Sequence, residues 1–188
     1  MLFLSHISSK NPLSGVDYKQ MTPDQMVVTD LDGKPLEADG YRPSSDLPTH
    51  VVLYKAFPGV NAVVHTHSKY AVCWAQAGRD LPCYGTTHAD TFYGPVPLTR
   101  HLTETEVAEA YEVNTGVVIA DTFKERNLDP LAVPGVLVQG HGPFSFQNRQ
   151  RFQDRRIPTS CKSSIHFGFP PDPLCRRYSC PNLRRRRA

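Results

Sequence analysis

The sequence predicts a protein of the α/β class. Short apolar runs with the character of strands alternate with longer segments that carry helical periodicity and helix-start signals. With 188 residues and a hydrophobic share of 39%, the chain is long enough for one domain with a buried core. We predict that this domain covers residues 1–149 and that residues 150–188 form a separate tail.

The first half of the domain contains a predicted hairpin, a helix and a strand. Residues 26–29 are a short apolar run, and the Asp-Gly pair at 32–33 is a hairpin-turn signal. A helix is predicted over about 47–57, with Asp46 as its N-cap. Residues 62–66 form the strand that follows it.

The second half contains three predicted helices and a strand. Helices are predicted over 68–77 and 103–114, and the latter begins with the capping-box pattern Thr-Glu-Thr-Glu. A break at Gly116 is predicted to separate it from a further helix that ends at Phe123. Residues 136–139 form the last predicted strand.

The tail differs from the domain in composition. Residues 150–188 hold ten basic and two acidic residues, a net charge of +8, which leaves −5 for the rest of the chain. The tail is rich in Arg, Pro, Ser and Cys without a sustained period, so we expect it to be disordered. Its Cys161, Cys175 and Cys180, with His166, lack the paired Cys-x₂-Cys spacing of zinc sites.

Composition argues against several classes of protein. No stretch approaches the roughly 18 apolar residues of a membrane span. The apolar start, Met-Leu-Phe-Leu, is short and lacks the basic region of a secretory signal. Five cysteines in such a chain do not indicate a disulfide framework. We therefore expect a cytoplasmic protein without a membrane partner.

The sequence His65-Thr66-His67 is the most informative motif. Side chains i and i+2 of a strand point to the same face, so both imidazoles can share one metal ion, at about 2.0–2.1 Å per Zn–N bond. His141, between two glycines after an apolar run, is the third candidate ligand. Three histidines with an open position are typical of catalytic zinc, and Asp46 is a candidate oxygen ligand or neighbour of the metal. Taken alone, the His-x-His pair also fits two ordinary histidines at a strand end.

Two small polar segments are candidates for phosphate binding. Ser14 and Gly15 form one segment, and Ser44 and Ser45 form the other, just before a predicted helix. Serine hydroxyls and backbone amides near a helix start can hold a phosphate. Without further context, a plain turn and a helix cap explain these residues more simply.

Three residues are candidates for work on the substrate itself. Asp90 is a candidate general acid or base, and Thr86, in the same Gly-Thr-Thr-His-Ala-Asp stretch, can bond a substrate hydroxyl. Glu112 is a weaker candidate. Each of the three also fits a solvated surface position.

Several motifs together carry a family resemblance that covers roughly 130 of the 188 positions. They are Ser14-Gly15-Val16-Asp17-Tyr18, Pro43-Ser44-Ser45-Asp46, His65-Thr66-His67-Ser68, Trp74-Ala75-Gln76-Ala77-Gly78, Gly85-Thr86-Thr87-His88-Ala89-Asp90, Tyr111-Glu112 and Gly140-His141-Gly142-Pro143-Phe144. In these stretches the chain resembles the class II aldolase family, and its L-ribulose-5-phosphate 4-epimerase branch in particular.

The resemblance implies an α/β/α sandwich on a mainly antiparallel central sheet, incomplete here at both ends. It implies a Zn²⁺ enzyme of pentose phosphate metabolism and arabinose catabolism that converts L-ribulose 5-phosphate to D-xylulose 5-phosphate. The C3–C4 bond is cleaved by a retro-aldol step and re-formed with C4 inverted. The resemblance also implies a homotetramer with active sites between neighbours.

Carried over by position, the resemblance assigns residues to each part of the site. It implies zinc binding by His65, His67 and His141, with Asp46 at the metal. It implies phosphate binding by Ser14, Gly15, Ser44 and Ser45, and active-site roles for Asp90, Thr86 and Glu112.

The chain departs from the family pattern at both ends. Only 13 residues precede Ser14, and the likeness ends at about residue 149, as it would in a truncated, out-of-frame product of an epimerase gene. On this interpretation we expect an unpaired sheet edge, low stability and impaired activity. Two other functions stay open: a class II aldolase that cleaves a sugar phosphate, and an inactive scaffold whose basic tail binds nucleic acid, the less favoured of the two.

Overall fold

The computed structural model describes residues 2–5, 8–11, 19, 22, 25–36 and 42–148, all within one unit that spans residues 1–153. The tail at 150–188, with its predicted disorder, cysteine ligands and nucleic-acid binding, lies outside the described residues.

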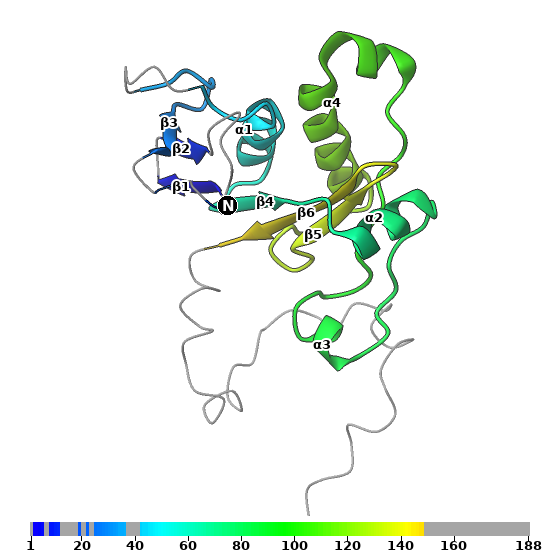
Figure 1. Cartoon of the computed structure of the whole chain (residues 1–188). Helices are drawn as coiled ribbons and strands as arrows, with labels where there is room; N and C mark the ends of the chain where they lie inside the picture. Colours follow the sequence, from blue (N-terminus) through cyan, green and yellow to red (C-terminus); the bar gives the residue numbers. More distant parts are fainter. Residues whose placement is uncertain are drawn as a thin grey trace, which may run out of the picture. The chain divides into compact units, whose positions relative to one another are not determined.

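One antiparallel sheet runs through this unit, with the strand order β3-β2-β1-β4-β6-β5 (Figure 1). Its strands are β1 (Leu2–Ser5), β2 (Ser8–Asn11), β3 (Val27–Thr29), β4 (Ala62–His65), β5 (Gly135–Val138) and β6 (Gly142–Gln147). The predicted hairpin follows β3, where Thr29 pairs with Pro35 across a turn that holds Gly33 at a φ of +80°. The prediction of a mainly antiparallel sheet is confirmed.

The N-terminal residues form strands that were not predicted. Residues 1–15 show no period in sequence, yet they contribute β1 and β2, which pair with each other. Strand β1 also pairs with β4, with Leu2 opposite Val63 and Phe3 opposite Ala62. Strand β4, which ends at His65, therefore has a partner strand on each side, and the outer strands of the described sheet are β3 and β5.

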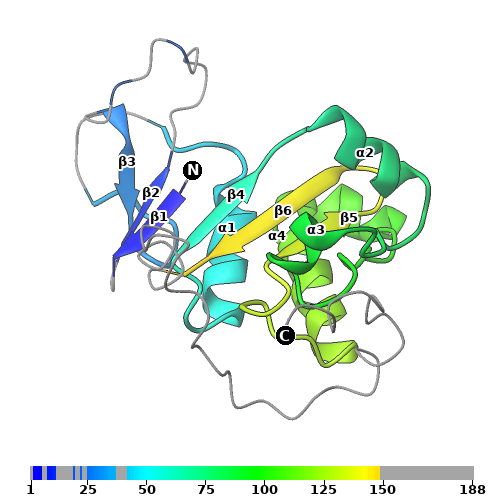
Figure 2. The same ribbon diagram turned by 90° about the horizontal axis from the view of Figure 1, so that it is seen from below.

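Helices α1 (Leu47–Ala56) and α4 (Glu104–Glu125) cover one face of the sheet (Figures 1 and 2). Between them and the strands lies the main core, in which Leu53, Phe123 and Phe144 are almost fully buried. The Tyr54 hydroxyl accepts a hydrogen bond from the Val63 amide at 3.3 Å, which ties α1 to β4.

Helices α2 (Lys69–Gln76) and α3 (Thr86–Ala89) lie on the opposite face (Figure 2). Strand β5 contributes side chains to both faces of the sheet, because successive side chains along a strand point to opposite faces. Its Val136 and Val138 join the main core, whereas Leu137 packs with Ala75 in a second, smaller core. The structure thus has helices on both faces of the sheet, and the predicted α/β class is confirmed.

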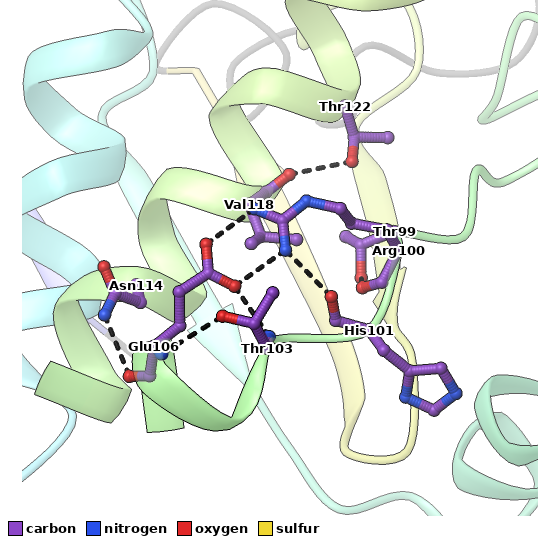
Figure 3. Close-up of polar contacts among 8 residues, drawn as sticks. All are labelled: Thr99, Arg100, His101, Thr103, Glu106, Asn114, Val118 and Thr122. Atoms are coloured by element: carbon purple, nitrogen blue, oxygen red, sulfur yellow. Dashed lines mark hydrogen bonds and ion pairs between the residues drawn. The ribbon is translucent and has the colours of Figure 1, made fainter. Parts of the chain in front are cut away.

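The capping box predicted for α4 is present (Figure 3). The Thr103 hydroxyl accepts from the Glu106 amide at 3.2 Å, and the Thr103 amide donates to the Glu106 carboxylate at 2.8 Å. That carboxylate also forms a two-pronged ion pair with Arg100, with N–O distances of 2.6 and 2.7 Å. The pair and the capping box together hold Glu106 in place at the start of the helix.

Two details of α4 differ from the prediction. The helix runs without a break at Gly116, and its non-helical residue is Ala110, at φ −159° and ψ 67°. Gly116 serves packing instead, because a Cβ there would lie 2.8 Å from the Val52 Cβ and 3.0 Å from the Thr49 carbonyl oxygen of α1. Glycine lets the two helices approach this closely.

The N-cap predicted for α1 forms in position only, and α2 begins in the same way. Asp46 and Ser68 occupy the N-cap positions of α1 and α2, yet neither side chain caps its helix by a hydrogen bond. Strand β6 was not predicted, although Phe144 and Phe146 alternate with polar residues in its sequence and are buried on one face. No helix among the described residues has the length and apolar character that crossing a membrane requires.

Candidate metal centre

Three imidazoles from distant parts of the chain meet at one end of the sheet. His65 is the last residue of β4, His67 lies two residues further on, and His141 lies in the turn between β5 and β6. One ring nitrogen of each lies within 4.8 Å of the others. The sequence thus predicted which histidines come together, and antiparallel pairing of β4 with β6 is what brings them there.

His65 is oriented by two contacts with β6. Its Nδ1 lies 3.0 Å from the Pro143 carbonyl oxygen, which can only accept, so Nδ1 carries the proton. Its ring stacks on that of Phe144, with centroids 4.1 Å apart. Nε2 is therefore the nitrogen with a free lone pair, and this buried atom has no hydrogen-bond partner in the described part of the chain. A buried, unpartnered lone pair is what a metal ligand requires.

The turn that carries His141 depends on its two flanking glycines. Gly140 has a φ of +75°, a left-handed conformation that glycine adopts without strain. A Cβ at Gly142 would lie 3.0 Å from the Thr66 carbonyl oxygen, so the absence of a side chain lets the turn approach the His65–His67 segment. The Thr66 amide donates to the Pro143 carbonyl at 3.4 Å across the same contact.

The distance between His67 and His141 fits a shared cation. Their Nε2 atoms are 3.1 Å apart. Two ligand nitrogens on a tetrahedral Zn²⁺ would be about 3.3 Å apart, given bonds of about 2.0–2.1 Å. Burial lowers the pKa of His141, as do the nearby His65 and His67, and burial is also the main cause that lowers the pKa of His65. Lower pKa values favour the neutral imidazole, which is the form that binds metal.

Asp46 lies near this cluster without belonging to it. Its charge acts to raise the pKa values of His65 and His141, so the carboxylate is close enough to influence both rings. The three histidines alone form the group of potential ligand atoms within 4.8 Å, among the residues that the structure describes. The structure thus puts the charge of Asp46 near the cluster and leaves its carboxylate outside the group of potential ligand atoms.

Tyr111 is the site residue that the sequence did not single out. Its hydroxyl oxygen lies 3.0 Å from Nδ1 of His141. Burial raises the pKa of Tyr111, and the charges of Glu112 and Asp46 raise it further. The signal in the sequence was the motif Tyr111-Glu112. A carboxylate is a more familiar catalytic group than a phenol, so the motif drew attention to Glu112 and not to Tyr111.

The predicted phosphate-binding residues divide into two groups. Ser14 and Gly15 lie outside the described residues. Ser44 and Ser45 lie in the turn before α1, where Ser45 is exposed and the Ser44 hydroxyl accepts from the Asp46 amide at 3.3 Å. The turn that carries these serines therefore also carries Asp46, next to the histidine cluster.

The three candidates for work on the substrate make no hydrogen bond to the imidazoles, among the residues that the structure describes. Thr86 and the residue after α3, Asp90, are both exposed. Glu112 is half-buried on α4, and its carbonyl accepts from the Thr49 hydroxyl at 2.6 Å. The hydrogen bonds of the three imidazoles go to Pro143, Tyr111 and one another, and none goes to these three candidates in the described part of the chain.

Comparison with known proteins places the chain in a family and agrees with the fold. Residues 11–150 match the family model described as the class II aldolase and adducin N-terminal domain. A protein of Salmonella paratyphi C (strain RKS4594) named L-ribulose-5-phosphate 4-epimerase UlaF is 54% identical over 133 residues, which are 71% of this chain and 57% of that protein. A Mycoplasma pneumoniae protein with the name "Probable L-ribulose-5-phosphate 4-epimerase UlaF" is 48% identical over 136 residues, 72% of this chain and 56% of that protein. The chain thus spans somewhat more than half the length of these relatives.

Solved structures support the same architecture. An L-fuculose 1-phosphate aldolase superposes with a TM-score of 0.61 at 20% identity, over 79% of this chain and 64% of that one. The L-fuculose-1-phosphate aldolase of Thermus thermophilus gives a TM-score of 0.60 at 19% identity, over 79% of this chain and 67% of that one. At such identities the likeness concerns the fold alone, and it confirms the predicted class II aldolase architecture.

Proposed function

We propose, for a chain that belongs to the class II aldolase and adducin N-terminal domain family, that the three-histidine cluster is the metal centre of a sugar-phosphate epimerase. The reaction we propose is the conversion of L-ribulose 5-phosphate to D-xylulose 5-phosphate by inversion at C4. The relatives named as epimerases support this choice of substrate. The observation that carries the proposal is the convergence of His65, His67 and His141 within 4.8 Å.

The donor set fits Zn²⁺. Neutral imidazoles suit a borderline ion, and three of them leave one coordination position for a substrate oxygen. When bound, zinc supplies a Lewis acid that stabilises negative charge on that oxygen. The chain itself orients His65: the Pro143 carbonyl fixes its proton on Nδ1, and its ring stacks on Phe144 of β6.

The remaining residues take the roles that the family resemblance suggests. Ser44 and Ser45, with Ser14 and Gly15, would hold the substrate phosphate. Glu112 and Asp46 would act beside the metal that is bound by the histidines of their own chain. We also propose a cytoplasmic homotetramer.

The exposed position of α3 supports a role for its residues in a neighbouring subunit. Figures 1 and 2 place α3 on the face of the sheet opposite α4, which carries Glu112. Thr86 and Asp90 of one chain would therefore work at the metal centre of the next, with Asp90 as general acid or base.

Product analysis tests the proposal. Purified full-length chain, with Zn²⁺ added, would be incubated with L-ribulose 5-phosphate, and a His67→Ala variant would serve as the control. D-xylulose 5-phosphate that depends on zinc and on His67 supports epimerisation. Dihydroxyacetone together with glycolaldehyde phosphate would indicate the aldolase alternative instead. Failure of the wild-type chain to retain zinc at all would refute the proposed metal centre.

A further inference from the structure

We propose that Tyr111 is a positioning residue that holds His141 in the orientation the metal centre needs, a role that rests on the metal centre proposed above. The two side chains come from different elements, α4 and the β5–β6 turn. They meet with the phenolic oxygen 3.0 Å from the Nδ1 atom of His141 and with ring centroids 5.8 Å apart.

The direction of this hydrogen bond follows from the other side of the His141 ring. Its Nε2 faces Nε2 of His67 at 3.1 Å and is the atom that would face a cation shared by the two rings. An imidazole that offers the Nε2 lone pair to a metal carries its proton on Nδ1. Nδ1–H of His141 therefore donates, and the Tyr111 hydroxyl oxygen accepts.

His65 shows the same arrangement with a different partner. Its Nδ1–H donates to the Pro143 carbonyl at the same distance, 3.0 Å, and its Nε2 is left free. Two of the three rings thus have an oxygen acceptor on Nδ1 and Nε2 turned toward the cluster. For His65 the acceptor comes from the backbone, whereas for His141 a side chain supplies it.

The backbone of α4 bends next to Tyr111. The helix leaves helical geometry at Ala110, the residue immediately before it. The Asn114 side-chain amide donates at 2.8 Å to the Glu106 carbonyl, which a regular helix would pair with the amide of Ala110. On the other side of the kink, the Glu112 carbonyl accepts from Thr49 of α1 at 2.6 Å. These two contacts hold the bend that immediately precedes Tyr111.

Zinc affinity of the full-length chain provides the first test. Tyr111→Phe removes the acceptor and keeps the ring, so we expect zinc binding to weaken about tenfold to a hundredfold, measured by competition with a chromophoric chelator. Tyr84→Phe is the matched control, because Tyr84 is a 75% exposed tyrosine whose ring lies near Trp74, and it should bind zinc like the wild type. Urea unfolding of the metal-free variants should give unchanged midpoints.

A double variant shows whether Tyr111 acts through His141. In a His141→Ala background the ring to be positioned is gone, so adding Tyr111→Phe should change zinc affinity no further. An equal loss in both backgrounds would overturn the positioning role, as would wild-type affinity in the single variant. If the wild-type chain binds no zinc, the proposed function itself fails, and the role of Tyr111 fails with it.

Discussion

Acid should destabilise this fold through His50, a buried histidine of α1. Its side chain is 2% exposed, and its Nδ1 has no hydrogen-bond partner in the described part of the chain. Burial, with a smaller contribution from the nearby His65, lowers the pKa of His50 from 6.5 to about 3. Because the folded-state pKa lies below the unfolded value, the unfolded chain takes up the proton first. The stabilisation is complete above pH 6.5 and is lost as the pH falls toward 3.

The size of the effect follows from linkage. At pH 5, about 1.5 units below the unfolded pKa, the loss attributable to His50 is about 2 kcal/mol. We would measure the free energy of unfolding in urea by circular dichroism at pH 7.5 and pH 5.0, without metal. The pKa values of His65 and His141 are also lowered, so these residues add to the loss of stability in acid. The contribution of His50 is therefore the difference between the acid-induced losses of the wild type and of His50→Leu. An acid-induced loss as large in His50→Leu as in the wild type would show that this imidazole does not stay neutral in the fold.

Three further predictions concern packing, capping and the metal turn. Gly116→Ala should lower the free energy of unfolding by about 1–3 kcal/mol, because its Cβ would lie 2.8 Å from that of Val52. Gly85→Ala is the control, since nothing lies within 4 Å of a Cβ there, and equal urea midpoints for the two variants would contradict the packing argument. Thr103→Ala should cost about 1 kcal/mol in the same assay through loss of the α4 cap, and an unchanged midpoint would mean that the cap contributes nothing. Gly142→Ala should weaken zinc binding about tenfold in chelator competition by pushing the His141 turn away from Thr66, and wild-type affinity would show that the turn tolerates a side chain.

Local patterns in the sequence predicted much of the fold. The capping box at Thr103 could be predicted because it depends on neighbours within one turn of helix. Strands β1 and β2 could not, because residues 2–11 lack an alternating pattern and are held in the sheet by pairing with β3 and β4. The kink at Ala110 depends on Thr49 and Asn114, and contacts between helices leave little trace in local periodicity.

Contacts between residues distant in sequence also limited how much of the metal centre could be predicted. His65 and His67 are two residues apart in sequence, so their proximity follows from chain geometry alone. His141 could be added because glycines flank it after a buried strand. Tyr111 could not, since its contact with His141 depends on how α4 packs across the sheet and on where its backbone bends.

Asp46 shows how a residue that departs from its usual local role can indicate function. Aspartate is among the preferred N-cap residues, and Asp46 occupies the N-cap position of α1, yet its side chain does not cap the helix. Its charge acts instead on the His65 and His141 rings. If the carboxylate serves the metal, Asp46→Ala should weaken zinc binding while the free energy of unfolding of the metal-free chain falls by less than the roughly 1 kcal/mol of a lost cap. A full cap-sized loss of stability with unchanged zinc affinity would mean that Asp46 serves the helix after all.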